Sequence, residues 1–292
     1  MRLSPTFVRT IEECNLRARW SRIDAAPREV PPADAALRYG TAAHAALETL
    51  VTAVVAAGAV ADLTEDLWRQ RTAAAVSEAV DEHGPFPKDV VERLHRIVSD
   101  HAEDLATLDA RDVLGVEVPL RWRAGTDTPV IGFADRVDRI DASTVRVTDY
   151  KTGRRAFTAD DVQASLQLQT YAVAAASRHR WAEAVEVEVA QLDRRERERA
   201  RWSAEELARI AEELAERYLA ADRRITEGPW EATEGDWCRI CEFATLCPAK
   251  GGEPAPGTWD PRIPGIRDAH PRLPGLDDAP TGDSGDPGSP AR

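Results

Sequence analysis

The sequence predicts an α/β fold, in which helices flank a mixed β-sheet. Helical periodicity dominates the N-terminal part of the chain. Between Val113 and Tyr150 the pattern changes to alternating apolar and polar residues with many valines, as in half-buried strands. Helical and strand patterns then alternate once more. The chain has 292 residues, 43% hydrophobic and 30% charged, so it can bury a sizeable core.

Four helical segments are expected before the first strand. The first begins after Ser4, a suitable N-cap, with Pro5 at the first helical position. The expected ranges are 4–20, 40–57, 62–82 and 88–108.

The remaining elements build the sheet and cover it. Strands are expected over 113–122, 130–140, 144–150 and 184–192, and helices over 159–176 and 203–223. Asp141-Ala142-Ser143 is expected to form the turn between the second and third strands. The run from Asp193 to Arg201 mixes both signs of charge, which is typical of a solvated turn rather than a DNA-binding patch.

The C-terminal segment differs in composition from the rest. Residues 251–292 contain 9 of the 19 prolines and 8 of the 17 glycines, without apolar periodicity. Such a segment buries too little surface to offset the entropy of ordering it, so we expect a disordered tail after a domain of residues 1–250.

Nothing in the sequence indicates secretion or a membrane. The N-terminus lacks an apolar signal core, and the most apolar stretch, Leu50–Val60, is shorter than the roughly 20 residues that span a bilayer. We therefore expect a cytoplasmic protein. Its four cysteines would lie in a reducing compartment, where metal ligation is favoured over disulfides.

An acidic pair and a lysine are predicted to meet on neighbouring strands. Asp149 and Lys151 are two residues apart and so share one face of a strand, and hairpin pairing brings Asp135 beside Asp149. Two close carboxylates repel unless a cation lies between them, and Mg²⁺ or Mn²⁺ suits oxygen ligands. The alternative is an ion-pair ladder on a solvated sheet face.

Three further polar residues stand out on predicted helices. His44 is a lone histidine among alanines, with Glu48 one turn later, and a buried core histidine is the ordinary interpretation. Gln167 and Tyr171 share one helix face at the i and i+4 positions, as many surface pairs do. None of these positions is specific by itself.

Together, however, the motifs form an ordered set: Gly40-x-x-x-His44, Gly132-x-x-Asp135-Arg-Val-Asp138, Asp149-Tyr-Lys151-Thr-Gly and Gln167-Leu-x-x-Tyr171. The set resembles the RecB-like branch of the PD-(D/E)XK nuclease superfamily over residues 40–171. The resemblance implies a restriction-endonuclease-like fold and metal-dependent cleavage of DNA phosphodiester bonds.

The resemblance also implies residue roles. His44, Asp135, Asp149 and the backbone carbonyl of Tyr150 would bind the metal ion, and Lys151 would act on the attacking water and the scissile phosphate. Gln167 and Tyr171 would support the site and contact DNA. Asp138 is the weaker choice for the first aspartate, and Glu48 and Glu117 are supporting groups around the ligands.

The cysteines form a second motif. Cys238, Cys241 and Cys247 are clustered, and Cys14 lies far upstream. Four thiolates suit either a structural zinc ion or an iron–sulfur cluster, and the spacing does not separate them. A buried Cys14 that takes no part is a further alternative.

The resemblance favours iron–sulfur. The AddB nuclease domain and CRISPR-associated RecB-like exonucleases are similar in having one cysteine before the nuclease core and three after it, around a 4Fe–4S cluster. Such a cluster would join the two ends of the domain as a structural clasp. Cys14-Asn15 departs from the Cys-Pro frequent in that family.

Charge gives a partial check on a DNA substrate. The net charge of −13 opposes non-specific nucleic-acid binding, but residues 146–180 contain six Lys and Arg against three Asp and Glu. We therefore expect local, metal-dependent engagement of single-stranded or duplex DNA ends.

The function expected is a DNA exonuclease in repair, recombination or phage DNA processing. The alternatives are a DNA-end-binding or adaptor subunit of a helicase or integrase complex with little activity, and a zinc-stabilised scaffold. No Gly-x-x-x-x-Gly-Lys-Ser/Thr motif is present, so a helicase or recombination partner would be a separate protein.

Overall fold

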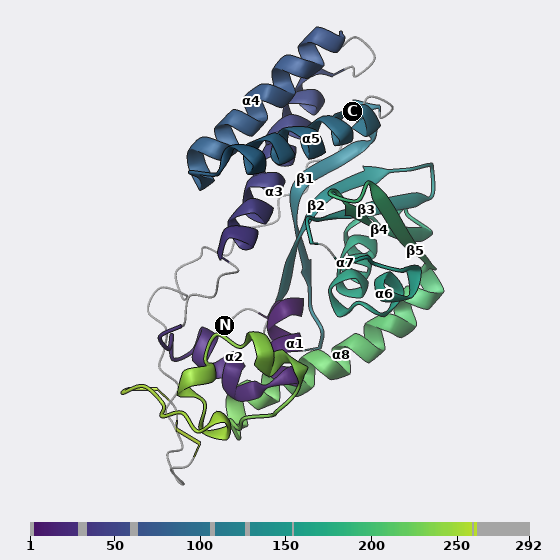
Figure 1. Ribbon diagram of the computed structural model, residues 1–292. Helices are drawn as coiled ribbons and strands as arrows, with labels where there is room; N and C mark the ends of the chain where they lie inside the picture. Colours follow the sequence, from purple (N-terminus) through teal and green to yellow (C-terminus); the bar gives the residue numbers. More distant parts are fainter. Residues whose placement is uncertain are drawn as a thin grey trace, which may run out of the picture.

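The computed structural model describes residues 3–28, 34–58, 64–105, 109–125, 129–153, 155–258 and 260–261. Its centre is a five-stranded sheet in the order β1-β2-β3-β4-β5 (Figure 1). The strands are β1 (Val113–Trp122), β2 (Val130–Arg139), β3 (Thr144–Lys151), β4 (Ala184–Gln191) and β5 (Glu196–Ser203). Only the β3–β4 pair is parallel, so the predicted mixed sheet and α/β class are confirmed.

Three long helices form a layer beside β1 and the end of β3 (Figure 1). They are α3 (Asp34–Ala57), α4 (Glu65–His83) and α5 (Lys88–Leu105). Leu47, Leu50, Val76 and Leu94 are fully buried between them. Helix α3 begins six residues before the predicted Gly40. Residues 62–63 and 106–108, at the ends of two predicted helices, lie outside the described residues.

Helix α3 is long and apolar enough, from Ala35 to Ala57, to satisfy the length and composition of a membrane span. The expectation based on Leu50–Val60 alone underestimated this apolar segment. Within the protein, its apolar residues pack against α4 and α5, as those of a core helix do.

The predicted first helix is two helices, α1 (Pro5–Glu13) and α2 (Asn15–Arg22). The expectation of one helix over 4–20 was wrong at Cys14, whose backbone is extended. Asn15 explains the break, because its side chain donates to the Pro229 carbonyl and accepts from the Glu231 N–H. These bonds tie the turn to the C-terminal part of the chain.

The opposite face of the sheet is covered by α1, α7 and α8 around an apolar core. The predicted helix over 159–176 is interrupted at Ser165, giving α6 (Ala159–Ala164) and α7 (Leu166–Arg178). Ser165 is extended and caps α7 by accepting from the Leu168 N–H at 3.4 Å. Helix α8 (Ala204–Glu227) starts at a capping box formed by Ser203 and Glu206.

Strand β5 corrects the expectation of a solvated turn over Asp193–Arg201. Its arginines alternate along the strand, and Arg197 and Arg199 bind Glu188 of β4. Trp202 points the other way and is buried. The alternation that is typical of a strand was therefore present in the sequence, but it was an alternation of arginine and glutamate instead of apolar and polar residues.

Among the described residues after α8, three short stretches form 3₁₀ helices: Asp236–Ile240, Ala244–Leu246 and Pro248–Lys250. They pack beside α1 and α2 (Figure 1), where Phe243 meets Trp20 edge-on at 5.8 Å between ring centroids. Most of the segment predicted to be a disordered tail, residues 262–292, lies outside the described residues.

Candidate active site

Asp135 is the centre of the polar cluster at the middle of β2. One carboxylate oxygen, Oδ2, accepts from the Tyr150 backbone N–H of β3 at 2.5 Å. The other, Oδ1, lies 2.9 Å from Nδ1 of His44 on α3. Asp135 is 9% exposed and is therefore fixed between the sheet and the helical layer.

The register of β2 and β3 places the second acid. Arg136 pairs with Thr148, so the next step along the ladder brings Asp135 opposite Asp149. Lys151 Nζ lies 2.7 Å from Asp149 Oδ2, and Gln167 Nε2 donates to Asp149 Oδ1 at 3.2 Å. The structure therefore brings Asp135, Asp149, Lys151 and Gln167 together at the end of β3.

Two motif glycines allow close approaches around the site. A Cβ atom on Gly132 would lie 2.3 Å from the Tyr171 ring, and one on Gly40 would lie 3.1 Å from Thr152 Oγ1. The Tyr171 hydroxyl accepts from Gln167 at 2.9 Å. Gly132 therefore makes room for the ring that supports Gln167.

Glu117 is a site residue whose place the sequence interpretation underestimated. Ligand atoms of His44, Glu117 and Asp135 all lie within 4.8 Å of one another, so Glu117 belongs with potential metal ligands rather than around them. It has a φ of 46° in an irregular part of β1. The available signal was that Glu117 is the only acidic residue in an apolar strand.

The electrostatics of the site reflect crowded negative charge. Burial and the charges of Asp135 and Glu48 raise the pKa of Glu117 to about 7. Burial raises the pKa of Asp149 despite Lys151, and Asp135 adds to that rise. Burial would lower the pKa of His44, but its hydrogen bond to Asp135 and the charges of Asp135 and Asp149 outweigh burial and raise it.

The donor set fits a divalent cation. A neutral imidazole nitrogen and two carboxylates within 4.8 Å can converge on one ion, and the carboxylates favour Mg²⁺ or Mn²⁺. A cation would also relieve the repulsion that raises the pKa of Glu117. In contrast, Asp149 is held by Lys151 and Gln167 and lies outside this three-residue group.

Comparison with known proteins identifies the family. The family model of the PD-(D/E)XK nuclease superfamily matches residues 2–248. The chain belongs to this superfamily. Asp149-Tyr150-Lys151 fits the D-x-K part of its name. Superfamily membership indicates a metal-dependent nuclease acting on DNA.

No match was found among curated protein sequences. One similar solved structure, titled "Crystal structure of SSO0001", has 16% sequence identity and a TM-score of 0.29. The match covers 62% of this chain and 78% of that chain.

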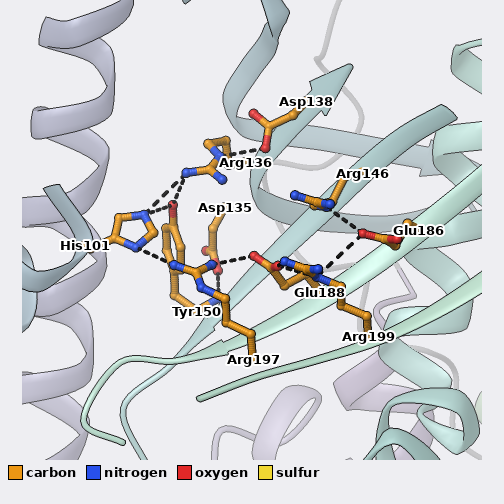
Figure 2. Close-up of polar contacts among 10 residues, drawn as sticks. All are labelled: His101, Asp135, Arg136, Asp138, Arg146, Tyr150, Glu186, Glu188, Arg197 and Arg199. Atoms are coloured by element: carbon orange, nitrogen blue, oxygen red, sulfur yellow. Dashed lines mark hydrogen bonds and ion pairs between the residues drawn. The ribbon is translucent and has the colours of Figure 1, made fainter. Parts of the chain in front are cut away.

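Behind the PD-(D/E)XK residues, a buried polar network links α5 to four strands (Figure 2). The Tyr150 hydroxyl lies 3.0 Å from His101 Nε2 and 3.2 Å from Arg136 Nη1. Arg136 Nε donates to Asp138 Oδ2 at 2.9 Å. Asp138, the weaker choice for the first aspartate, therefore lies in this network and is paired with Arg136.

The network continues to the sheet edge as ion pairs. Arg197 and Arg199 both bind Glu188, and Arg146 Nε donates to Glu186 at 2.7 Å (Figure 2). Glu188 is 1% exposed. These are cross-strand ion pairs of the kind considered for Asp149 and Lys151, which are themselves paired at 2.7 Å.

The four cysteines line one hollow at the other end of the molecule. Cys14 comes from the α1–α2 junction, while Cys238, Cys241 and Cys247 come from the 3₁₀ segment. All four are free thiols. Burial raises the pKa of Cys241, and Cys14 contributes to that rise.

Proposed function

We propose that this protein is a metal-dependent DNA exonuclease of the RecB-like branch. The observation that carries the proposal is the convergence of His44, Glu117 and Asp135 beside the Asp149–Lys151 pair. The ordered motifs from Gly40 to Tyr171 support the RecB-like assignment, and the exonucleolytic action is inferred from the same resemblance.

In this proposal, His44, Glu117, Asp135, Asp149 and the Tyr150 carbonyl hold Mg²⁺ or Mn²⁺. The cation would supply Lewis-acid stabilisation of charge on the phosphate. Asp135 is oriented for this task by the Tyr150 N–H and His44, which occupy one carboxylate oxygen each. Asp149 is oriented by Gln167, whose amide is itself bonded to Tyr171.

Lys151 supplies a positive charge that can contact the substrate. Its Nζ is paired with Asp149, and its side chain is 32% exposed, so it can reach a substrate phosphate at the surface. A lysine there can orient or help deprotonate the attacking water and neutralise charge that develops on the phosphate.

We further propose that the four cysteines hold a 4Fe–4S cluster, with zinc as the alternative metal. Their shared hollow lies between the first two helices and the last described segment, so a cluster would clasp residues more than two hundred positions apart in sequence. Loss of a ligand should destabilise the fold before it affects the chemistry.

The wider setting follows from the activity. A cytoplasmic nuclease that acts on linear DNA ends suits repair, recombination or phage DNA processing. A helicase or recombination protein is the partner that we propose for this activity.

The function is tested by incubating linear single-stranded and duplex DNA with the protein and Mg²⁺ or Mn²⁺. Wild type should release nucleotides, and Lys151→Ala should lower the rate by about 10²- to 10⁴-fold. Lys88→Ala is the matched control, because Lys88 is exposed on α5. Intact DNA with wild type would favour an adaptor, and equal cleavage by wild type and Lys151→Ala would refute the assigned site.

The clasp is tested on protein purified without oxygen. Iron, sulfide and visible absorbance should be present in wild type and lost in Cys241→Ser. Stoichiometric zinc without iron would refute the iron–sulfur proposal.

A further inference from the structure

A second hollow lies next to the proposed active site, where α1, α6, α7 and α8 meet. Its volume is about 350 Å³. Its charged lining consists of Arg9, Arg155 and Arg217 against a single acid, Asp161. Arg9 and Arg155 are largely exposed, with side-chain exposures of 67% and 75%. The lining therefore carries an excess of positive charge, unlike the acidic site beside it.

Two contacts connect this hollow to the site residues. Gln167, which lines it, donates to Asp149. Phe157, which also lines it, donates its backbone N–H to Gln191 Oε1 at 3.0 Å, and Gln191 is the β4 partner of Lys151. A ligand in the hollow would thus lie directly beside the residues that hold Asp149 and Lys151.

An aromatic ring and an arginine meet inside the hollow. The Arg155 guanidinium lies over the Phe157 ring, 5.8 Å from its centroid. Aromatic rings that stack bases, combined with arginines that follow the backbone, are how proteins bind single-stranded nucleic acid without base-specific contacts. Arg9 is paired with Glu13 and Arg155 with Asp161, both half-buried carboxylates. Because the two guanidinium groups are themselves exposed, such ion pairs contribute little, and phosphates can compete for the arginines.

On the basis of the proposed nuclease function, we propose that this hollow binds one strand of the DNA substrate as it approaches the site. Phe157 stacks a base, and Arg9 and Arg155 contact phosphates. The size favours a single strand, because a volume of about 350 Å³ holds a nucleotide-sized group but not a double helix. The proposal adds a substrate path formed by segments that are distant in sequence.

The test is binding of a fluorescent single-stranded oligonucleotide in EDTA, where cleavage is suppressed. Phe157→Ala should weaken binding by about 5- to 150-fold, the effect of losing one stacked base. Arg9→Ala and Arg155→Ala should each lower the salt dependence of the binding constant by about 0.7 in logarithmic slope. Arg69→Ala is the matched control, because Arg69 is similarly exposed and paired with acids on α4.

Because Phe157 is half-buried, the exposed Arg155 provides a test that does not depend on core packing. Wild-type affinity and salt slope in Arg9→Ala and Arg155→Ala would overturn the proposal, as would a duplex that competes as well as the single strand. Cleavage by wild type in Mn²⁺ is measured in parallel. If wild type cleaves and these variants bind normally, the path is wrong and the function stands; if wild type does not cleave, the proposed function fails.

Discussion

Two charged clusters lie back to back on β2 and β3, and they differ in how their charges are balanced. The ionic network comprises Arg136, Asp138, Arg146, Glu186, Glu188, Arg197 and Arg199, together with His101 and Tyr150 (Figure 2). The acidic site comprises His44, Glu48, Glu117, Asp135, Asp149 and Lys151. Neighbouring residues alternate between them, since Asp135 precedes Arg136 and Tyr150 separates Asp149 from Lys151.

In the ionic network each acid has an arginine partner, although burial still raises the pKa of Asp138 beside Arg136. Burial would raise the pKa of Glu188, but Arg197 and Arg199 hold it below its ordinary value. In the acidic site, the same kind of burial raises the pKa of Glu117 to about 7, because its neighbours Asp135 and Glu48 are also acids. The contrast indicates that removing an arginine from the network would leave a buried acid without its partner, whereas the site keeps uncompensated negative charge that a cation can neutralise.

The largest expected effect is on stability, from breaking the network. Arg136→Met removes the partner of Asp138, which is fully buried, and should lower the free energy of unfolding by about 3–5 kcal/mol. The control is Arg139→Met, because Arg139 is exposed and stacks over Trp181, a contact worth about 0.5–1 kcal/mol. Urea unfolding measures the free energy of unfolding of both variants. Equal losses in Arg136→Met and Arg139→Met would show that the buried Arg136–Asp138 pair contributes no more than an exposed arginine.

The second-largest effect is expected on kcat, if the ionic network helps to position the residues of the acidic site. Tyr150→Phe leaves the ring but removes the hydroxyl that His101 and Arg136 hold, so the Tyr150 N–H is less well fixed against Asp135. We expect kcat to fall by up to about 100-fold with KM unchanged. Tyr218→Phe is the matched control, since this buried hydroxyl bonds Thr170 at 2.9 Å. Comparable kcat values in Tyr150→Phe and Tyr218→Phe would show that the network does not position the catalytic residues.

The third effect concerns Glu117. Glu117→Gln should weaken Mn²⁺ binding by about 10- to 100-fold in calorimetry. Without metal, the wild type loses stability as pH rises from about 4.5 to about 7, because the unfolded carboxyl ionises first and the folded one resists ionisation. The variant should lack this loss and be more stable than wild type at pH 8. If the stability of wild type and of Glu117→Gln depended on pH in the same way, the loss of stability would not come from ionisation of Glu117.

The smallest expected effect is the contribution of His101 to the pH dependence of the free energy of unfolding. Burial and the charges of Arg136 and Arg197 hold its pKa well below the ordinary value, so the folded histidine stays neutral while the unfolded one takes up a proton. This contribution to stability is present above about pH 6.5 and is lost as pH falls, by up to about 1.4 kcal/mol per pH unit. His101→Gln should flatten the slope between pH 6.5 and 5, measured by urea unfolding. An unchanged pH slope of stability in His101→Gln would show that other groups cause the pH dependence.

Local periodicity explains what could be predicted from the sequence. The strand period of two and a short turn at Asp141–Ser143 are enough to place Asp135 opposite Asp149, and Lys151 beside it. The α/β class follows from the same change of period. These features depend on residues close in sequence, where propensity and pattern act directly.

Other features depend on contacts between distant segments. The approach of Glu117 to Asp135 depends on the pairing of β1 with β2, in which Val116 and Val118 lie opposite Arg136 and Ala134. The alternation of Arg and Glu in β5 gave a strand pattern made of charged residues, which the apolar periodicity does not detect. The break at Cys14 depends on Asn15 meeting Pro229 and Glu231, which no local pattern contains. The arginine-lined hollow likewise joins residues from α1, the segment after β3 and α8.

The most direct test of the central claim compares wild type with Asp135→Asn. Mn²⁺-dependent hydrolysis of linear DNA and the free energy of unfolding are measured on the same preparations. Without metal, Asp135→Asn should be at least as stable as wild type, because a buried negative charge is gone, and it should no longer cleave DNA. Cleavage at the wild-type rate by a folded Asp135→Asn protein would contradict the account.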